Sequence, residues 1–379
     1  MKEIQIIRGK ERLGEILFII GIVLELVVMM TDHCASFTLP LRGRVTQVAF
    51  ALFALKILTT GYRPKQFIIM ILCGVVGVVS YLTCKDEMVV RLTVMVLSSV
   101  NIDLDRCLKI ILAGTLLGTV AIICMSVTGI AGDMYSIADF GRGGEEKRWM
   151  FGFNHANNLH CMYWYITSLV ILIYRERIKI PVYVALLAGD MGLFFLTRSR
   201  SGLLAVTLVI VLCLVAEIFP KGEKSALPYV IGMAIVVMSF VFTVIASALG
   251  TEGRLLGLLN KVLNSRLYMC YKVAPLNEWK IFPGSRVTEY ALDNGIAYIA
   301  YIYGIAVMIM FLAAIMYLCI RACRKRQMWL LALTLGYVGI LFMESSFVTN
   351  VSLLCCFGAV LLLGRLSSED EEKVEKRCF

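Results

Sequence analysis

The sequence is poor in charge and in proline. Only 17% of its 379 residues are charged and only 7 are proline, whereas 59% are hydrophobic. Soluble domains carry charge on about a quarter of their residues, and the apolar runs here are too many and too long for a soluble core. This composition excludes an ordinary soluble enzyme and predicts an all-α polytopic membrane protein, a single integral membrane domain over residues 1–379.

Signs of metal and disulfide chemistry are missing as well. The 13 cysteines show neither a disulfide framework nor the CxxC spacing of a zinc site. Most lie inside apolar runs, where a free thiol behaves as a small hydrophobic side chain. No acidic pair with the DxD spacing of a metal site occurs in the segments expected outside the cell. We therefore predict no metal site and no cofactor.

What the chain has is about twelve apolar runs of near-membrane length. The weakest is 88–100, which is short and contains Arg91; if it did not cross, every later span would reverse direction. The predicted spans are 15–31, 45–60, 67–84, 88–100, 108–128, 157–174, 181–197, 202–218, 228–249, 291–319, 328–343 and 348–364.

Lysine and arginine distribute unevenly between the connections. With a basic cytoplasmic N-terminus and all twelve spans in place, every connection on the cytoplasmic side is short and basic, as the positive-inside rule requires. Both termini are then cytoplasmic, including the charged tail 366–379. The basic residues of these connections include Arg63, Arg106, Arg177, Lys179, Lys224, Arg324 and Arg326.

Three polar segments remain on the outer side. The segment 128–156 is rich in glycine, and 250–290, before the tenth span, is the longest connection. In the latter, the apolar pattern from Leu255 to Leu263 predicts an amphipathic helix on the membrane surface. The third, Thr197 to Gly202, separates two spans.

That third segment places Arg198 and Arg200 between the hydroxyl groups of Ser199 and Ser201. A guanidinium at the edge of the hydrocarbon costs on the order of 2.5 to 3.5 kcal/mol unless water or an anion surrounds it. Anchoring at the interface is the simple explanation for a lone arginine. Two arginines interleaved with hydroxyls suit a polyanionic oxygen cluster such as a diphosphate.

Two short motifs then carry a resemblance to the O-antigen ligase/polymerase superfamily of bacterial cell envelopes. A Phe-Gly-x-x-His-x-Asn element enters one span, and a Leu-Thr-x-Ser-Arg-Ser-Gly-Leu-Leu element opens a later one. Asn294 and Tyr298, which follow the long loop, match as well. The motif residues here are Phe151-Gly152-Phe153-Asn154-His155-Ala156-Asn157 and Leu196-Thr197-Arg198-Ser199-Arg200-Ser201-Gly202-Leu203-Leu204. Ala156 replaces a usual proline, which alanine can do in a first helical turn, and Arg198 stands where a small residue is more common.

The resemblance implies a GT-C-like, metal-independent glycosyltransferase. It would act on a polyprenyl-diphosphate-linked oligosaccharide at the outer face of the bacterial cytoplasmic membrane. The implied partners are this lipid-linked sugar and the bilayer, not nucleic acid, and the sequence leaves open whether a flippase and a chain-length regulator also take part. The cations for the diphosphate would come from Arg148, Arg198 and Arg200, with Arg254, Arg266 and Arg286 of the long loop closing over them.

Within the superfamily, a missing histidine decides between polymerase and ligase. The ligases that the chain resembles place a candidate base histidine in the long external loop, but residues 250–290 contain none. Three carboxylates remain to assist the acceptor hydroxyl: Glu278, Glu289 and Asp293. We therefore predict a repeat-unit polymerase. The alternatives are a ligase that transfers glycan to a final acceptor and a transporter of lipid-linked sugar.

Several candidate residues also have a purely structural explanation. His155 either contacts substrate or bonds to backbone, and Asn157 and Asn294 are expected near helix starts, where asparagine is a common cap. Glu344 at the end of a late span either hydrates or pairs with an arginine. Glu25 and Lys56 lie within spans, where ionisable residues are functional candidates unless they pair between helices.

Overall fold

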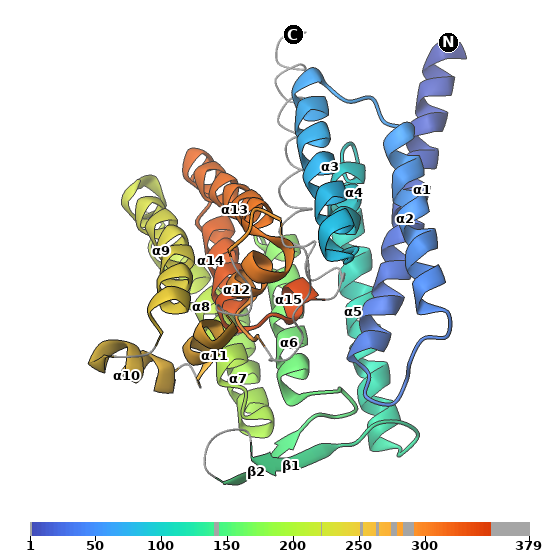
Figure 1. The fold of residues 1–379 in the computed structure, drawn as a ribbon. Coiled ribbons are helices and arrows are strands. Elements are labelled where there is room, and N and C mark those ends of the chain that lie inside the picture. Colours follow the sequence, from blue (N-terminus) through green and yellow to red (C-terminus); the bar gives the residue numbers. More distant parts are fainter. Residues whose placement is uncertain are drawn as a thin grey trace.

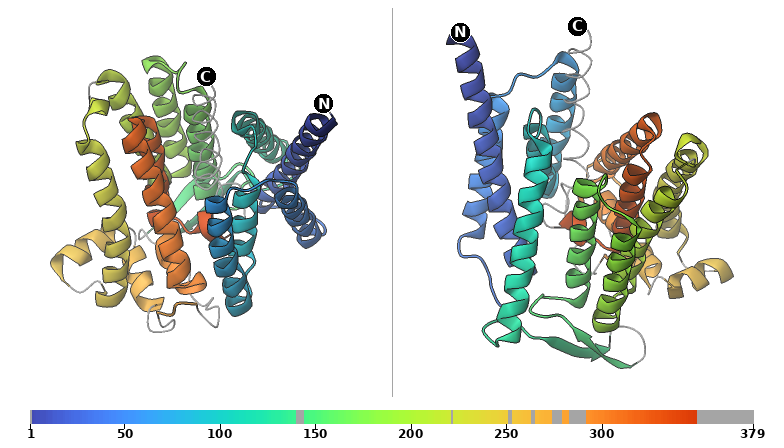
Figure 2. Two further views of the ribbon diagram at one scale, coloured as in Figure 1. Left: turned by 90° about the horizontal axis from the view of Figure 1, so that it is seen from above. Right: turned by 180° about the vertical axis from the view of Figure 1, so that it is seen from behind.

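The computed structural model describes residues 2–139, 144–220, 222–250, 253–262, 265–273, 279–282 and 292–349. The chain is mostly helical, and its long helices form two groups side by side (Figures 1 and 2). The first group holds α1 (Lys2–His33), α2 (Arg42–Leu58), α3 (Pro64–Cys84), α4 (Met88–Ser98) and α5 (Leu104–Val127). The second holds α6 (Ala156–Tyr174), α7 (Ile180–Thr197), α8 (Arg200–Ile218), α9 (Leu227–Leu249), α13 (Ile305–Lys325) and α14 (Met328–Met343).

Shorter elements connect these helices. The first two, β1 and β2, form an antiparallel hairpin, and α10 lies across the direction of the long helices (Figure 1). The short elements are β1 (Tyr135–Asp139), β2 (Glu145–Trp149), η1 (Gly222–Lys224), α10 (Arg254–Val262), α11 (Arg266–Val273), α12 (Gly295–Tyr298), the π-helical turn η2 (Ile299–Tyr303) and α15 (Ser346–Thr349).

Seven helices of the described chain are long and apolar enough to cross a membrane: α1, α3, α5, α7, α8, α9 and α13. This confirms a helical chain of the multi-pass membrane type. Four other predicted spans also contain helices: α2, α4, α6 and α14. These helices are shorter or more polar than the seven of membrane length. The twelfth predicted span, 348–364, and the tail 366–379 lie almost wholly outside the described residues, so the number twelve stays a prediction.

The tenth span was wrongly bounded. A single span was predicted over 291–319, but the chain breaks at Gly304, whose φ of 96° ends one helical segment before α13 begins. Residues 295–303 form the short α12 and η2 segment, which is buried throughout, and the membrane-length helix runs from Ile305 to Lys325. Glycine alone adopts such a φ and ψ readily, so the break depends on this residue.

Two further features were not predicted. The segment 128–156, predicted to lie outside, carries the β1–β2 hairpin, although only helices and loops were predicted. Helix α4 has 11 residues, and at about 1.5 Å of rise per residue it is too short to cross the roughly 30 Å hydrocarbon layer alone. It packs instead against α2 and α3.

The long helices alternate in direction along the chain. One end of the bundle holds the N-terminus and four connections: α2–α3, α6–α7, α8–α9 and α13–α14 (Figures 1 and 2). The β1–β2 hairpin and α10 lie at the opposite end, which we call the hairpin end. The basic residues of the predicted cytoplasmic connections therefore gather away from the hairpin. This order agrees with the predicted alternation through α14; the assignment of that end to the cytoplasm stays a prediction.

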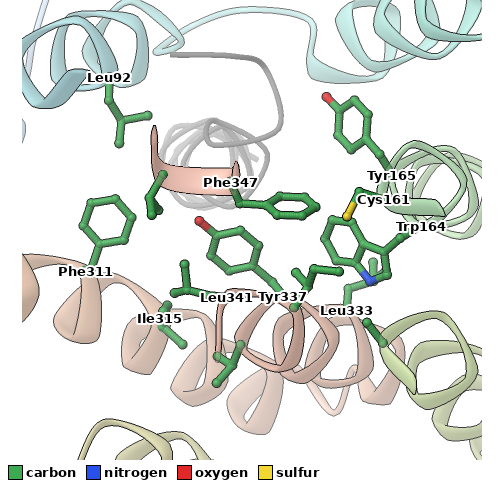
Figure 3. Packing of buried hydrophobic residues seen from close by; sticks show 14 of the residues in the cluster. Leu92, Cys161, Trp164, Tyr165, Phe311, Ile315, Leu333, Tyr337, Leu341 and Phe347 are labelled. Atoms are coloured by element: carbon green, nitrogen blue, oxygen red, sulfur yellow. The ribbon is translucent and has the colours of Figure 1, made fainter. Parts of the chain in front are cut away.

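Aromatic packing joins α6, α14 and α15. Trp164 is fully buried, with its ring centroid 5.3 Å from that of Phe347 in an edge-on arrangement and 6.4 Å from that of Tyr337. Figure 3 shows Phe347 among side chains from α6, α13 and α14, with Leu92 of α4 nearby. Such aromatic contacts add to the stabilisation from apolar burial. They hold the segment after α14 against the bundle, next to the polar cluster described below.

Two buried charged residues of the first group, Arg91 and Lys56, have hydrogen-bond partners on neighbouring segments. The Arg91 guanidinium donates to both oxygens of Glu25, at 2.6 and 2.8 Å, and to Glu87 at 3.0 Å. The Lys56 ammonium donates to Thr60 and to the carbonyl of Val100. An ion pair therefore satisfies the Glu25 carboxylate, and two neutral oxygens satisfy the Lys56 ammonium.

Candidate functional site

A polar cluster gathers around Glu344, just beyond the last residue of α14. Its Oε1 accepts hydrogen bonds from Ser201 Oγ at 2.6 Å, from Arg266 Nη2 at 2.9 Å and from Asn157 Nδ2 at 3.2 Å. Asn157 belongs to the first turn of α6, Ser201 to the first turn of α8 and Arg266 to the start of α11. One carboxylate thus joins both motif segments to the long loop, at the hairpin end of the second helix group. We call these four residues the Glu344 cluster.

Burial dominates the electrostatics of this carboxylate. Only 8% of the Glu344 surface is exposed. Burial raises the pKa of its carboxyl group from 4.5 to about 7. The Arg266 charge and the Ser201 hydrogen bond act to lower this pKa, and the Asp293 charge acts to raise it. Burial favours the neutral form, and opposite charges and hydrogen bonds favour the charged form. Glu344 therefore changes protonation near neutral pH.

Arg266 links this cluster to Asp293. Its Nε lies 3.7 Å from Asp293 Oδ2, an ion-pair distance, while its Nη2 holds Glu344. The Asp293 side chain is 53% exposed. The buried and the exposed carboxylate thus share one guanidinium, and Asp293 is the one that a molecule from outside can reach.

His155 begins α6 as its N-cap. Its Nδ1 accepts the backbone N–H of Asn157 at 3.1 Å, so the histidine caps the helix while the Asn157 side chain points to Glu344. Burial lowers the pKa of His155; the Arg148 charge lowers it further and the Asp293 charge raises it. Arg148 is buried on β2 and pairs with Glu146 at 2.9 Å. Burial and the Arg148 charge thus favour the neutral form of the His155 imidazole.

The Arg198–Arg200 turn links α7 to α8. Arg198 ends α7 in the left-handed region with φ of 54°, a conformation that costs a non-glycine residue about 1–2 kcal/mol. Ser199 is the N-cap of α8, since its Oγ accepts the N–H of Gly202 at 3.3 Å. The side chains of Ser199 and Ser201 are buried, whereas Arg198 and Arg200 are exposed. The turn thus presents both arginines to the surroundings, beside the Glu344 cluster.

The remaining predicted residues divide into three groups. Asn294 caps α12 by accepting the Ala297 N–H at 2.8 Å, and Tyr298 lies in the core, its ring centroid 5.8 Å from that of Tyr303. Arg254 is exposed at the start of α10. Three candidates lie outside the described residues: Glu278, Arg286 and Glu289.

A second polar cluster was missed by the sequence analysis. His160 Nε2 lies 2.7 Å from Asp190 Oδ1, and His160 Nδ1 lies 3.1 Å from Thr197 Oγ1; all three residues are fully buried. No role was predicted for His160, and Asp190 was not considered. An acid within a predicted span is a functional candidate by default, so Asp190, the lone acid in 181–197, was a signal that could have been used.

The described residues contain no group of three or more histidine, cysteine, aspartate or glutamate side chains placed to hold a metal ion. The ten cysteines of the described ranges are free thiols. Positive charge at the site comes from arginine, and the Glu344 carboxylate accepts three hydrogen bonds.

No protein-family model, no curated protein and no solved structure matches this chain.

Proposed function

We propose that this protein is a polymerase that joins polyprenyl-diphosphate-linked oligosaccharide repeat units at the outer face of the bacterial cytoplasmic membrane. The observation that carries the proposal is the Glu344 cluster. Asn157 of the first motif, Ser201 of the second and Arg266 of the long loop meet on one carboxylate, although 187, 143 and 78 positions separate them from Glu344. Three segments singled out by the resemblance therefore meet in one polar cluster, which supports the proposal.

In the proposed reaction, an acceptor hydroxyl oxygen attacks the anomeric carbon of the lipid-linked sugar. The bond from that carbon to the diphosphate breaks, the lipid diphosphate leaves as an anion, and the hydroxyl proton passes to a carboxylate. Arg198 and Arg200 supply positive charge to the leaving group, and they are exposed on the turn where an anion can reach them. Preorganised charge of this kind stabilises the charge that develops in the transition state.

Asp293 is the candidate acceptor-side base. It is half exposed and lies beside Arg266, and a positioned base is typically worth about 10²- to 10⁴-fold in rate. Glu344 is buried and accepts three hydrogen bonds, so its role is to hold the two motif segments and α11 together. Glu278 and Glu289 remain proposed alternatives to Asp293.

Deletion of the gene tests this assignment. We expect single repeat units, lipid-linked or attached to the surface, and no long polymer. Long polymer that accumulates on its lipid carrier without reaching a final acceptor would indicate a ligase. An unchanged polysaccharide profile would contradict both.

A transporter of lipid-linked sugar is the second candidate. The break at Gly304, followed by α13 and preceded by the buried segment 295–303, resembles the discontinuous helices of transporters. In that case, deletion would leave the repeat units on the cytoplasmic side of the membrane. Repeat units on the outer face of the deletion strain would favour the polymerase instead.

A further inference from the structure

A buried network lies directly beneath the turn that carries Arg198 and Arg200. It consists of His160 in α6, Asp190 in α7, Thr197 at the end of α7 and Thr207 in α8. We propose that these four residues position the Arg198–Arg200 turn for diphosphate binding; the inference rests on the proposed function. We call them the His160 network.

The hydrogen bonds around Thr197 fix the direction of its contact with His160. The Thr197 hydroxyl donates its one proton to the carbonyl of Leu193 at 2.9 Å. Its oxygen accepts the backbone N–H of Ser199 at 3.3 Å. His160 Nδ1, at 3.1 Å, must therefore donate to this oxygen as an N–H group. The imidazole thus holds the hydroxyl that in turn holds the backbone of the turn.

Asp190 sets the orientation of that imidazole from the other side. Its Oδ1 lies 2.7 Å from His160 Nε2, and its Oδ2 accepts from the Thr207 hydroxyl at 2.9 Å. Wherever the proton between Nε2 and Oδ1 resides, the pair is neutral overall. Every polar atom of the network has a partner, and a fully satisfied buried network is rigid.

Close packing connects the same ring to the start of α8. A Cβ atom at Gly202 would lie 2.5 Å from Cγ of His160, closer than real Cβ contacts allow. Gly202 also donates its N–H to Ser199, the N-cap of α8. The ring therefore contacts the turn through Thr197 on one side and through Gly202 on the other, and Arg198, Ser199 and Arg200 lie between these two points.

The network acts on the arginines through the backbone and not on substrate. His160, Asp190 and Thr197 are fully buried, so none of them can touch a diphosphate outside the bundle. They are positioning residues, and their removal should change diphosphate binding at the turn even where the protein stays folded. A role limited to packing would lower thermal stability and leave the affinity of the folded protein unchanged.

The test is binding of geranylgeranyl diphosphate to the full-length protein in detergent micelles, with the melting temperature measured on the same samples. Thr197→Val removes the hydroxyl at nearly constant volume and should weaken binding about five- to tenfold, the equivalent of one lost hydrogen bond. Thr197→Ser keeps the hydroxyl and should bind within about twofold of the wild type. Thr115→Val is the matched control, because Thr115 is buried in α5 and its hydroxyl has no hydrogen-bond partner among the described residues.

Asp190→Asn provides a second conservative variant, which preserves volume and both hydrogen bonds of this side chain. The asparagine amide can donate its Nδ2–H to His160 Nε2 and accept the Thr207 hydroxyl with its Oδ1, so the Nδ1–H donor to Thr197 is retained. We expect binding within about twofold of the wild type.

Arg200→Ala separates the inference from the function on which it rests. Weaker binding in Arg200→Ala together with wild-type binding in Thr197→Val would overturn the inference alone. Wild-type binding in Arg200→Ala would overturn the proposed diphosphate site, and the inference with it. A lower melting temperature in Thr197→Val with unchanged affinity of the folded protein would assign the network a packing role and also contradict the inference.

Discussion

Replacement of Glu344 by glutamine should change how the stability of the protein depends on pH. In the folded protein the pKa of Glu344 rises from 4.5 to about 7, first because of burial. Since the folded state holds its proton more tightly than the unfolded state, the stabilising contribution is complete below pH 4.5 and is lost as pH rises through 7. Glutamine at this position has no proton to lose.

The magnitude follows from the shift. Each pKa unit corresponds to about 1.4 kcal/mol, so the ionisation of Glu344 makes about 3 kcal/mol of the unfolding free energy depend on pH between 4.5 and 7. The difference between wild type and Glu344→Gln isolates this contribution, because all other titrating groups are common to both. A change of this size moves a melting temperature by several degrees.

The assay is thermal unfolding of the purified protein in detergent at pH 5, 6, 7 and 8. Wild type should lose stability relative to Glu344→Gln as the pH rises. Glu217→Gln, at an exposed position near the end of α8, is the matched control for loss of a carboxylate. Arg266→Gln should move the wild-type transition to higher pH, because the Arg266 charge lowers the pKa of Glu344. Parallel pH profiles for wild type and Glu344→Gln would refute the buried cluster.

Three further outcomes follow from the fold and the site. Arg200→Lys should lose most polymer formation in a complementation assay while protein levels stay normal, because a lysine point charge does not replace a bidentate guanidinium contact. Arg198→Lys should lose less polymer formation. Arg44→Lys is the control, because Arg44 is an exposed arginine at the same end of the protein. Gly304→Ala should lower the unfolding free energy by about 1–3 kcal/mol in thermal denaturation, because φ is 96° there. Reporter fusions after residue 225 and at the C-terminus should both read cytoplasmic; disagreement between them would show that one predicted span does not cross.

The long helices of the second group were predictable because polar segments delimit their apolar runs. The predicted spans 181–197, 202–218 and 228–249 correspond to the helices Ile180–Thr197, Arg200–Ile218 and Leu227–Leu249. In each case an arginine, a serine or a proline lies at the boundary, so the end of the apolar run and the flanking residue indicate the same helix start. The membrane class and much of the helix order followed from the same signals.

Features that depend on distant contacts were not predictable. The break at Gly304 lies within an unbroken apolar run, and one glycine there gives no reason to expect a π-helical turn before it. The hairpin strands have only five residues each. The partners of Glu344 lie far away in the sequence, so its carboxylate was recognised as a candidate while its hydrogen bonds to Ser201 and Asn157 were not.

The central claim is that the Glu344 cluster and the Arg198–Arg200 turn form the site of glycan polymerisation. The most direct measurement is chain extension by the purified full-length protein in liposomes supplied with lipid-diphosphate-linked repeat units, with products resolved by length on a gel. The account predicts a ladder of lipid-linked chains longer than one unit, formed by wild type and lost in Arg200→Lys. Single units that remain unextended with wild-type protein, or a ladder of equal intensity with Arg200→Lys, would contradict it.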